Sequence, residues 1–119
     1  MSARKSVNTD KRSMNTIDRL VHEPARYLIM AYLSVTDGAD ALFLQRQTEL
    51  TWGNLSSHLS KLEAAGYVAV KKEFLDRKPH TMLHLTGEGR KAFEQYRKNM
   101  KQALEDLPYS GHGEVSSGA

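Results

Sequence analysis

The chain has 119 residues, a formal net charge of +3 and a hydrophobic content of 39%, which suits one domain with a modest core and leaves too little chain for two. It contains no cysteine, so disulfides and thiolate metal sites are excluded. It has no apolar run of about 18 residues and no signal-peptide core, so we expect a cytoplasmic protein without a membrane partner.

The N-terminal residues 1–13 are poor in apolar side chains and are predicted to be a flexible basic arm. Their charges are Arg4, Lys5, Lys11 and Arg12 against Asp10. Residues 51–80 hold five basic residues against three acidic ones, so the positive charge gathers in these two places. The arm either follows a nucleic-acid backbone or is an unengaged tail.

The folded domain is predicted over residues 14–107. A helical pattern runs from about Thr16 to Leu33, but Pro24 interrupts it and suits the first turn of a second helix that begins near Glu23. Residues 34–40 are interpreted as a loop around Asp-Gly. Residues 41–48 then form a short amphipathic helix, and a tight connection leads into the next segment.

Residues 51–65 are predicted to be a capped helix with two different faces. Three leucines share one face, and Thr51 and Gly66 suit its N-cap and the left-handed position after its end. The opposite face is short and hydrogen-bonding, and it carries Gly53, Asn54, Ser57, Ser60 and Lys61. Such a face is typical of a helix that enters a major groove. Two short helices joined by a tight connection indicate a helix-turn-helix.

A β-hairpin is predicted next, over about residues 68–85. Residues 67–74 are rich in β-formers, residues 75–80 are interpreted as a turn, and residues 81–85 return as a second strand. Pro79 is expected where the turn meets that strand. The fold class is therefore mainly α with a β-hairpin wing, a winged helix-turn-helix.

A long helix capped by Thr86 is predicted over about residues 86–107, and Pro108 begins a disordered tail over 108–119. Its apolar residues have the 3-4 spacing of a dimer seam. The predicted dimer interface is Phe93, Tyr96, Met100, Ala103, Leu104 and Leu107, with Ile17 and Leu20 from the N-terminal helix. The alternative is that these side chains only pack this helix onto its own domain.

Several segments together resemble prokaryotic winged-helix transcriptional regulators of the MarR/ArsR-like type. They are residues 54–67, 71–74, 77–79 and 85–90, and the His-Glu-Pro-Ala-Arg of residues 22–26. The resemblance spans about residues 15–100 and implies DNA contacts on the capped helix and at the wing tip. Together with the residue patterns it gives the predicted DNA-binding residues Thr51, Trp52, Asn54, Ser56, Ser57, Lys61, Lys71 (with Lys72 beside it), Arg77 and Lys78.

We therefore expect sequence-specific binding of double-stranded DNA by a homodimeric transcriptional regulator. The alternative is a winged-helix module that binds protein, and a small-molecule effector is left open. Trp52 either stacks on a sugar or packs against the preceding helix. No catalytic set and no cofactor are predicted. No metal site is predicted either, because His80 and His84 share a strand face without a third ligand.

Overall fold

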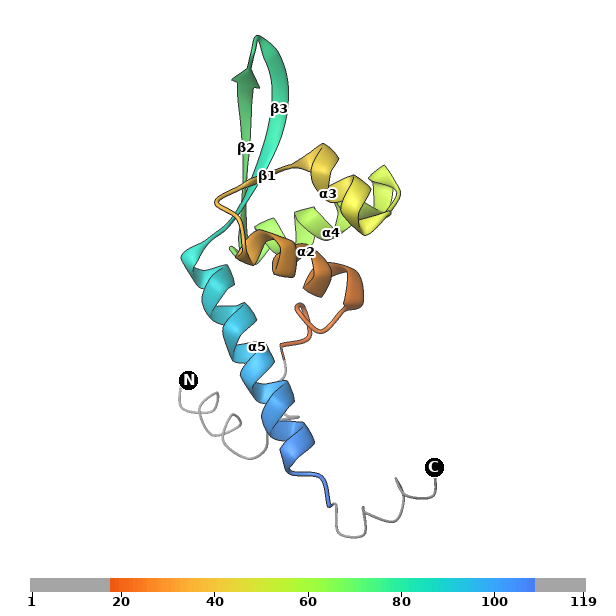
Figure 1. The fold of residues 1–119 in the computed structure, drawn as a ribbon, viewed down its shortest axis with the longest axis vertical. Helices are drawn as coiled ribbons and strands as arrows, with labels where there is room; N and C mark the ends of the chain where they lie inside the picture. The colour runs from red at the N-terminus through yellow and green to blue at the C-terminus, as the bar shows by residue number, and fades with distance from the viewer. Residues whose placement is uncertain (1–17, 109–119) are drawn as a thin grey trace. The chain divides into compact units, whose positions relative to one another are not determined.

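The computed structural model describes residues 18–108, which belong to two compact units, residues 18–97 and a second unit whose described part is residues 98–108. The arm of residues 1–13, Ile17 and the tail from residue 109 lie outside the described residues. The elements in chain order are α2 (Pro24–Ser34), β1 (Ala39–Asp40), α3 (Ala41–Thr48), α4 (Trp52–Ala64), β2 (Val68–Leu75), β3 (Lys78–Leu85) and α5 (Gly87–Glu105) (Figure 1).

The segment before α2 differs from the prediction. Residues 18–23 form turns and not helix, because the Asp18 carboxylate accepts from the amide of Leu20 at 2.9 Å and so competes with helical hydrogen bonding. The same carboxylate accepts from the Tyr67 hydroxyl at 2.6 Å. Burial, and then this carboxylate, raise the pKa of Tyr67 to about 12. The second helix begins where predicted, since Glu23 is the N-cap and Pro24 occupies the first turn.

A three-stranded antiparallel sheet follows, in the order β1-β3-β2. β1 lies in the segment predicted to be a loop, and its two residues pair with Leu83 and Met82. A strand of two residues is too short to show a period-2 pattern. The β2–β3 hairpin turns through only Asp76 and Arg77, whose φ values of 53° and 67° are left-handed. The turn predicted over residues 75–80 was therefore too long, because this two-residue turn needs only these positions.

One hydrophobic core joins the helices to the base of the hairpin. The leucine stripe of α4 is buried in it as predicted. The buried side chains are Val21, Ile29, Met30, Leu33, Ala39, Leu44, Leu55, Leu59, Leu62, Val68, Leu83 and Phe93. The outer half of the hairpin extends away from helices α2, α3 and α4 (Figure 1). This arrangement confirms the winged helix-turn-helix prediction.

The connection from the sheet into α5 is fixed by close backbone contacts. Thr86 caps α5 as predicted, since its hydroxyl accepts from the amide of Gly89 at 2.9 Å and donates to the carbonyl of Gly66 at 2.6 Å. A Cβ at Gly89 would lie 2.1 Å from the Tyr67 carbonyl oxygen, so only glycine fits. α5 ends at Glu105, two residues before the predicted end. None of the helices within residues 18–108 is long and apolar enough to cross a membrane.

Candidate nucleic-acid interface

Local capping positions helix α4. The Thr51 hydroxyl accepts from the Asn54 amide at 3.1 Å, which satisfies a free amide of the first turn. At the other end Gly66 has a φ of 82°, and the amides of Gly66 and Tyr67 both bond back to the last turn at 2.9 Å. Thr51 therefore fixes where the helix begins, and its hydroxyl is already engaged as an acceptor.

The turn between α3 and α4 is equally tight. Glu49 ends α3 in a left-handed conformation with a φ of 60°, and the Gln45 side-chain amide donates to the Leu50 carbonyl at 2.9 Å. Only three residues separate α3 from α4, as a helix-turn-helix requires.

The solvent-facing side of α4 matches the pattern predicted for it. All of its short polar positions are exposed, namely Asn54, Ser56, Ser57 and Ser60, together with Gly53 and Lys61. Trp52 is 52% exposed, so packing covers only part of its ring. A Cβ placed on Gly53 would meet no atom within 4 Å. The fold therefore does not require a glycine there, and the backbone of the first turn is open to a close approach.

His58 lies at the edge of this face and attaches α4 to α2. Its Nδ1 atom accepts from the Arg26 guanidinium at 3.1 Å, and Arg26 also donates from Nε to the Leu20 carbonyl at 2.7 Å. His58 thus helps to hold α4 against α2.

A groove runs between α4 and the wing. It is lined on the α4 side by Trp52, Ser56, Ser60 and Glu63, and on the sheet side by Val70, Lys72, Thr81 and Leu83. Since Lys72 pairs with Thr81 and Phe74 pairs with Pro79, these residues share one face of the hairpin, the face turned toward α4.

Lys71 belongs to the opposite face of the hairpin. It pairs with Met82, and along that face Glu73 pairs with His80 and Leu75 with Lys78. Of the two neighbouring lysines, Lys72 therefore lies on the side of the hairpin that faces α4. The sequence prediction favoured Lys71 and did not separate the two faces.

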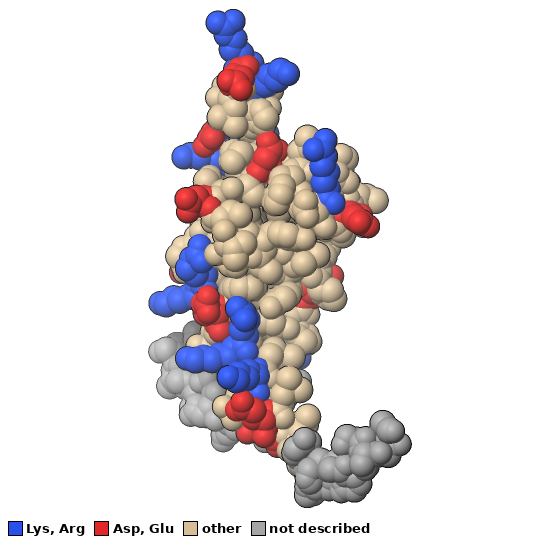
Figure 2. All heavy atoms as spheres, viewed as in Figure 1, with Lys and Arg blue, Asp and Glu red and all other residues tan. Residues whose placement is uncertain are grey.

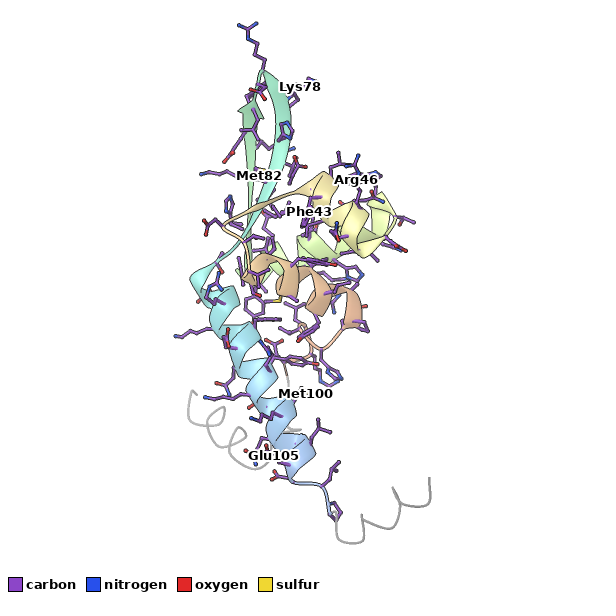
Figure 3. The ribbon with its side chains drawn as sticks, viewed as in Figure 1. Phe43, Arg46, Lys78, Met82, Met100 and Glu105 are labelled. Carbon is purple, nitrogen blue, oxygen red and sulfur yellow. The ribbon has the colours of Figure 1, made fainter. Side chains whose placement is uncertain are left out.

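Two cations and one carboxylate lie at the end of the hairpin, at Arg77, Lys78 and Asp76. Figure 2 shows blue Lys and Arg atoms at this end with red carboxylate atoms beside them, and both Arg77 and Lys78 are exposed. In Figure 3 Lys78 lies at the end of the hairpin that is far from α2, α3 and α4, and Arg46 lies on α3. Arg46 is a further exposed cation beside the helix-turn-helix that was missed. The sequence feature that could have identified it is that Arg46 is the only basic residue within residues 34–50.

Two histidines of β3 tie the wing to the segment that leads into α3. His80 donates from Nδ1 to the Oδ2 atom of Asp40 at 2.5 Å, and this hydrogen bond, more than any other cause, lowers the pKa of Asp40. His84 donates to the Asp37 carbonyl at 2.7 Å. Both histidines are thus engaged, and no group of three metal-ligating side chains occurs within residues 18–108.

The predicted dimer residues divide into two groups. Leu20 packs against the core, Phe93 is 2% exposed, and Tyr96 lies against Tyr27 with ring centroids 5.5 Å apart. The Phe93 side chain is therefore packed inside its own domain. In the unit of residues 98–108, Leu104 is 65% exposed and Leu107 is also exposed, while Met100 and Ala103 are half-buried.

Comparison with known proteins identifies a family and a relative with a similar sequence. Residues 25–104 match the family described as winged helix DNA-binding domain. An uncharacterized protein of Methanocaldococcus jannaschii is 33% identical over 78 residues, which cover 66% of this chain and 85% of that protein.

Solved structures show the same fold. A transcriptional regulator homologue from Pyrococcus horikoshii is similar with a TM-score of 0.70 and 28% identity, over 90% of this chain and all of that one. The S. aureus MepR–DNA complex gives a TM-score of 0.64 at 16% identity, over 99% and 94% of the two chains. NadR in complex with 4-hydroxyphenylacetate gives 0.62 at 22% identity, over 97% and 79%.

Proposed function

Because the chain belongs to the winged helix DNA-binding domain family, we propose that it is a transcriptional regulator that binds double-stranded DNA sequence-specifically as a homodimer. The observation that carries this proposal is the exposed face of α4. It presents amide and hydroxyl groups and an open glycine beside a basic hairpin.

In the proposed complex α4 lies in the major groove. Asn54 and Ser57 donate to and accept from base edges, and Lys61 contacts a base edge or a nearby phosphate. Each good base contact discriminates by about 1–3 kcal/mol. Trp52 and Ser56 line the wing side of the same helix, where a sugar or phosphate of the groove wall would lie. Thr51 acts through the cap that sets the first turn.

The wing supplies contacts that do not depend on sequence. Arg77 and Lys78 at its end, and Lys71 and Lys72 along β2, contact phosphates in the proposed complex. The exposure of all four side chains supports these roles. Each phosphate neutralised by a cation releases counterions, so binding weakens steeply as salt rises.

Dimerisation pairs two such modules on one site. The proposed contact surface consists of Met100, Ala103 and the exposed Leu104 of α5, together with the exposed Leu107, which follows the end of that helix. A two-fold dimer places its reading helices on half-sites about 10 base pairs apart, which multiplies affinity and specificity.

A small-molecule effector is the last part of the proposal. It is supported by the ligand-bound NadR and by a cavity in this chain lined by His22, Glu23, Pro24, Tyr27 and Tyr96. The Nδ1 atom of His22 and the Tyr96 hydroxyl are hydrogen-bonded to each other there at 2.9 Å and give the cavity a polar part of its lining.

The proposal is tested by fluorescence-anisotropy titration with mixed genomic fragments and with DNA from upstream of the gene, at two salt concentrations. We expect tight binding that prefers one fragment and weakens steeply with salt. Absence of binding at low salt would overturn the proposal and favour a protein-binding winged helix, with the exposed Trp52 as the first residue to examine.

A further inference from the structure

An aromatic side chain stands unpacked near the end of the wing. Phe74 is 74% exposed, although a buried phenylalanine contributes about 1.5–3 kcal/mol to stability. Its cross-strand partner is Pro79, which is also exposed. The fold gains little from this pair, so its apolar surface is available to a ligand.

The pair lies on the face of the hairpin that is turned toward α4. Val70 with Leu83 and Lys72 with Thr81 precede it along that face and line the groove. Phe74 and Pro79 come one pair further out, about 7 Å along the strands from Lys72 and Thr81. They therefore lie next to the site proposed for DNA, closer to the end of the hairpin.

The surrounding charges favour a nucleic acid over an apolar partner. Arg77 and Lys78 follow Phe74 around the turn, and Lys72 precedes it on the same face. The acidic residues nearby are Asp76 in the turn, Glu73, which lies on the opposite face paired with His80, and Glu63 of α4 across the groove. An apolar wedge between cations fits a minor groove, whose phosphates bind the cations while a base step accepts the wedge.

We propose that Phe74, supported by Pro79, inserts at a base step of the minor groove next to the major groove that α4 occupies, and bends the DNA. Arg77 and Lys78 hold the flanking phosphates. The cost of partly unstacking one step is offset by the apolar contact and by the closer wrapping of DNA around the wing. This inference rests on the proposed function, since it assumes binding of duplex DNA.

The test uses the full chain and the preferred DNA fragment with a donor and an acceptor dye at its two ends. Energy transfer reports bending, and anisotropy on the same samples reports affinity. The variants are Phe74→Ser, the conservative Phe74→Leu, and Leu75→Ser as a matched control, since Leu75 is exposed on the opposite face of the same hairpin end.

We expect the unmodified protein to raise energy transfer and Phe74→Ser to lose most of that change, with affinity reduced about tenfold. Phe74→Leu should keep most of the bend, and Leu75→Ser should behave like the unmodified protein. All variants should keep their melting temperature, because both side chains are exposed.

The inference is overturned if the protein binds the fragment without bending it, if Phe74→Ser bends DNA normally, or if Leu75→Ser loses as much as Phe74→Ser. In each case tight binding by the unmodified protein leaves the proposed function standing. Absence of DNA binding by the unmodified protein overturns both, and the exposed Phe74 then points to a protein partner.

Discussion

His80 of β3 and Asp40 at the start of α3 are joined by a hydrogen bond of 2.5 Å between Nδ1 and Oδ2. The other oxygen of Asp40 accepts from the Leu42 amide at 2.8 Å and caps α3. One carboxylate therefore caps the first helix of the helix-turn-helix and also bonds to the wing.

The first prediction concerns acid stability. Hydrogen bonding from His80 lowers the pKa of Asp40 in the folded protein. A lowered pKa contributes stability that is present above the ordinary pKa of the group and is lost as pH falls through the folded value. Asp40→Asn keeps a good capping side chain and removes the charge. Its urea midpoint should be lower than that of the unmodified protein at neutral pH, and the difference should shrink as the pH falls below 3.8, the ordinary pKa of the group. A difference that stays constant over this range would contradict the assignment.

The second prediction uses Gly53. Since a Cβ there meets no atom of the protein, Gly53→Ala should stabilise the fold by about 0.5 kcal/mol through helix propensity. The same methyl group projects from the exposed first turn of α4 and should weaken DNA binding severalfold. Thermal melting should show the gain in stability, and anisotropy should show the loss of DNA affinity. Unchanged DNA affinity would place the first turn of α4 away from the DNA.

The third prediction separates two glycines of α5. Gly89→Ala forces a methyl group against the Tyr67 carbonyl, which it would meet at 2.1 Å, and should cost about 2–3 kcal/mol. Gly87→Ala is the matched control, since its Cβ would meet nothing within 4 Å. Urea unfolding of both variants measures the contrast. Equal stability of the two would mean that the junction of β2 and α5 is looser than described.

The fourth prediction tests dimerisation. Leu104→Lys places a charge on the proposed contact surface and should shift the sedimentation mass from a dimer toward the 13.4 kDa of one chain. Glu105→Lys is the control, because it adds a lysine in the same turn of α5 but off the apolar seam. A mass of 13.4 kDa for the unmodified protein at micromolar concentration would refute the dimer.

Much of the fold follows from the sequence because several signals agree at the same residues. The leucine stripe, Thr51 and Gly66 specify α4 together, and Thr86 and the seam specify α5 in the same way. The predictions were wrong where contacts between distant segments of the chain determine the local structure. Asp18 holds its turn partly through Tyr67, and β1 exists only through its pairing with β3.

The candidate site was only partly visible in the sequence for a similar reason. Helical spacing places Asn54, Ser57 and Lys61 on one exposed side without further information. The register of the hairpin is needed to separate Lys72 from Lys71, and a one-residue slip would exchange them. The sequence prediction of a longer turn left that register undefined, so the pairing of Phe74 with Pro79 could not be inferred.

The most direct test of the central claim, that α4 reads the major groove, is methylation interference on the preferred DNA fragment. Guanine N7 lies on the major-groove edge, and adenine N3 lies in the minor groove. We predict that methylation of guanine N7 within each half-site prevents binding, and that Asn54→Ala combined with Lys61→Ala removes this interference along with most of the specificity. Tight, sequence-preferring binding that tolerates N7 methylation throughout the site would contradict the account.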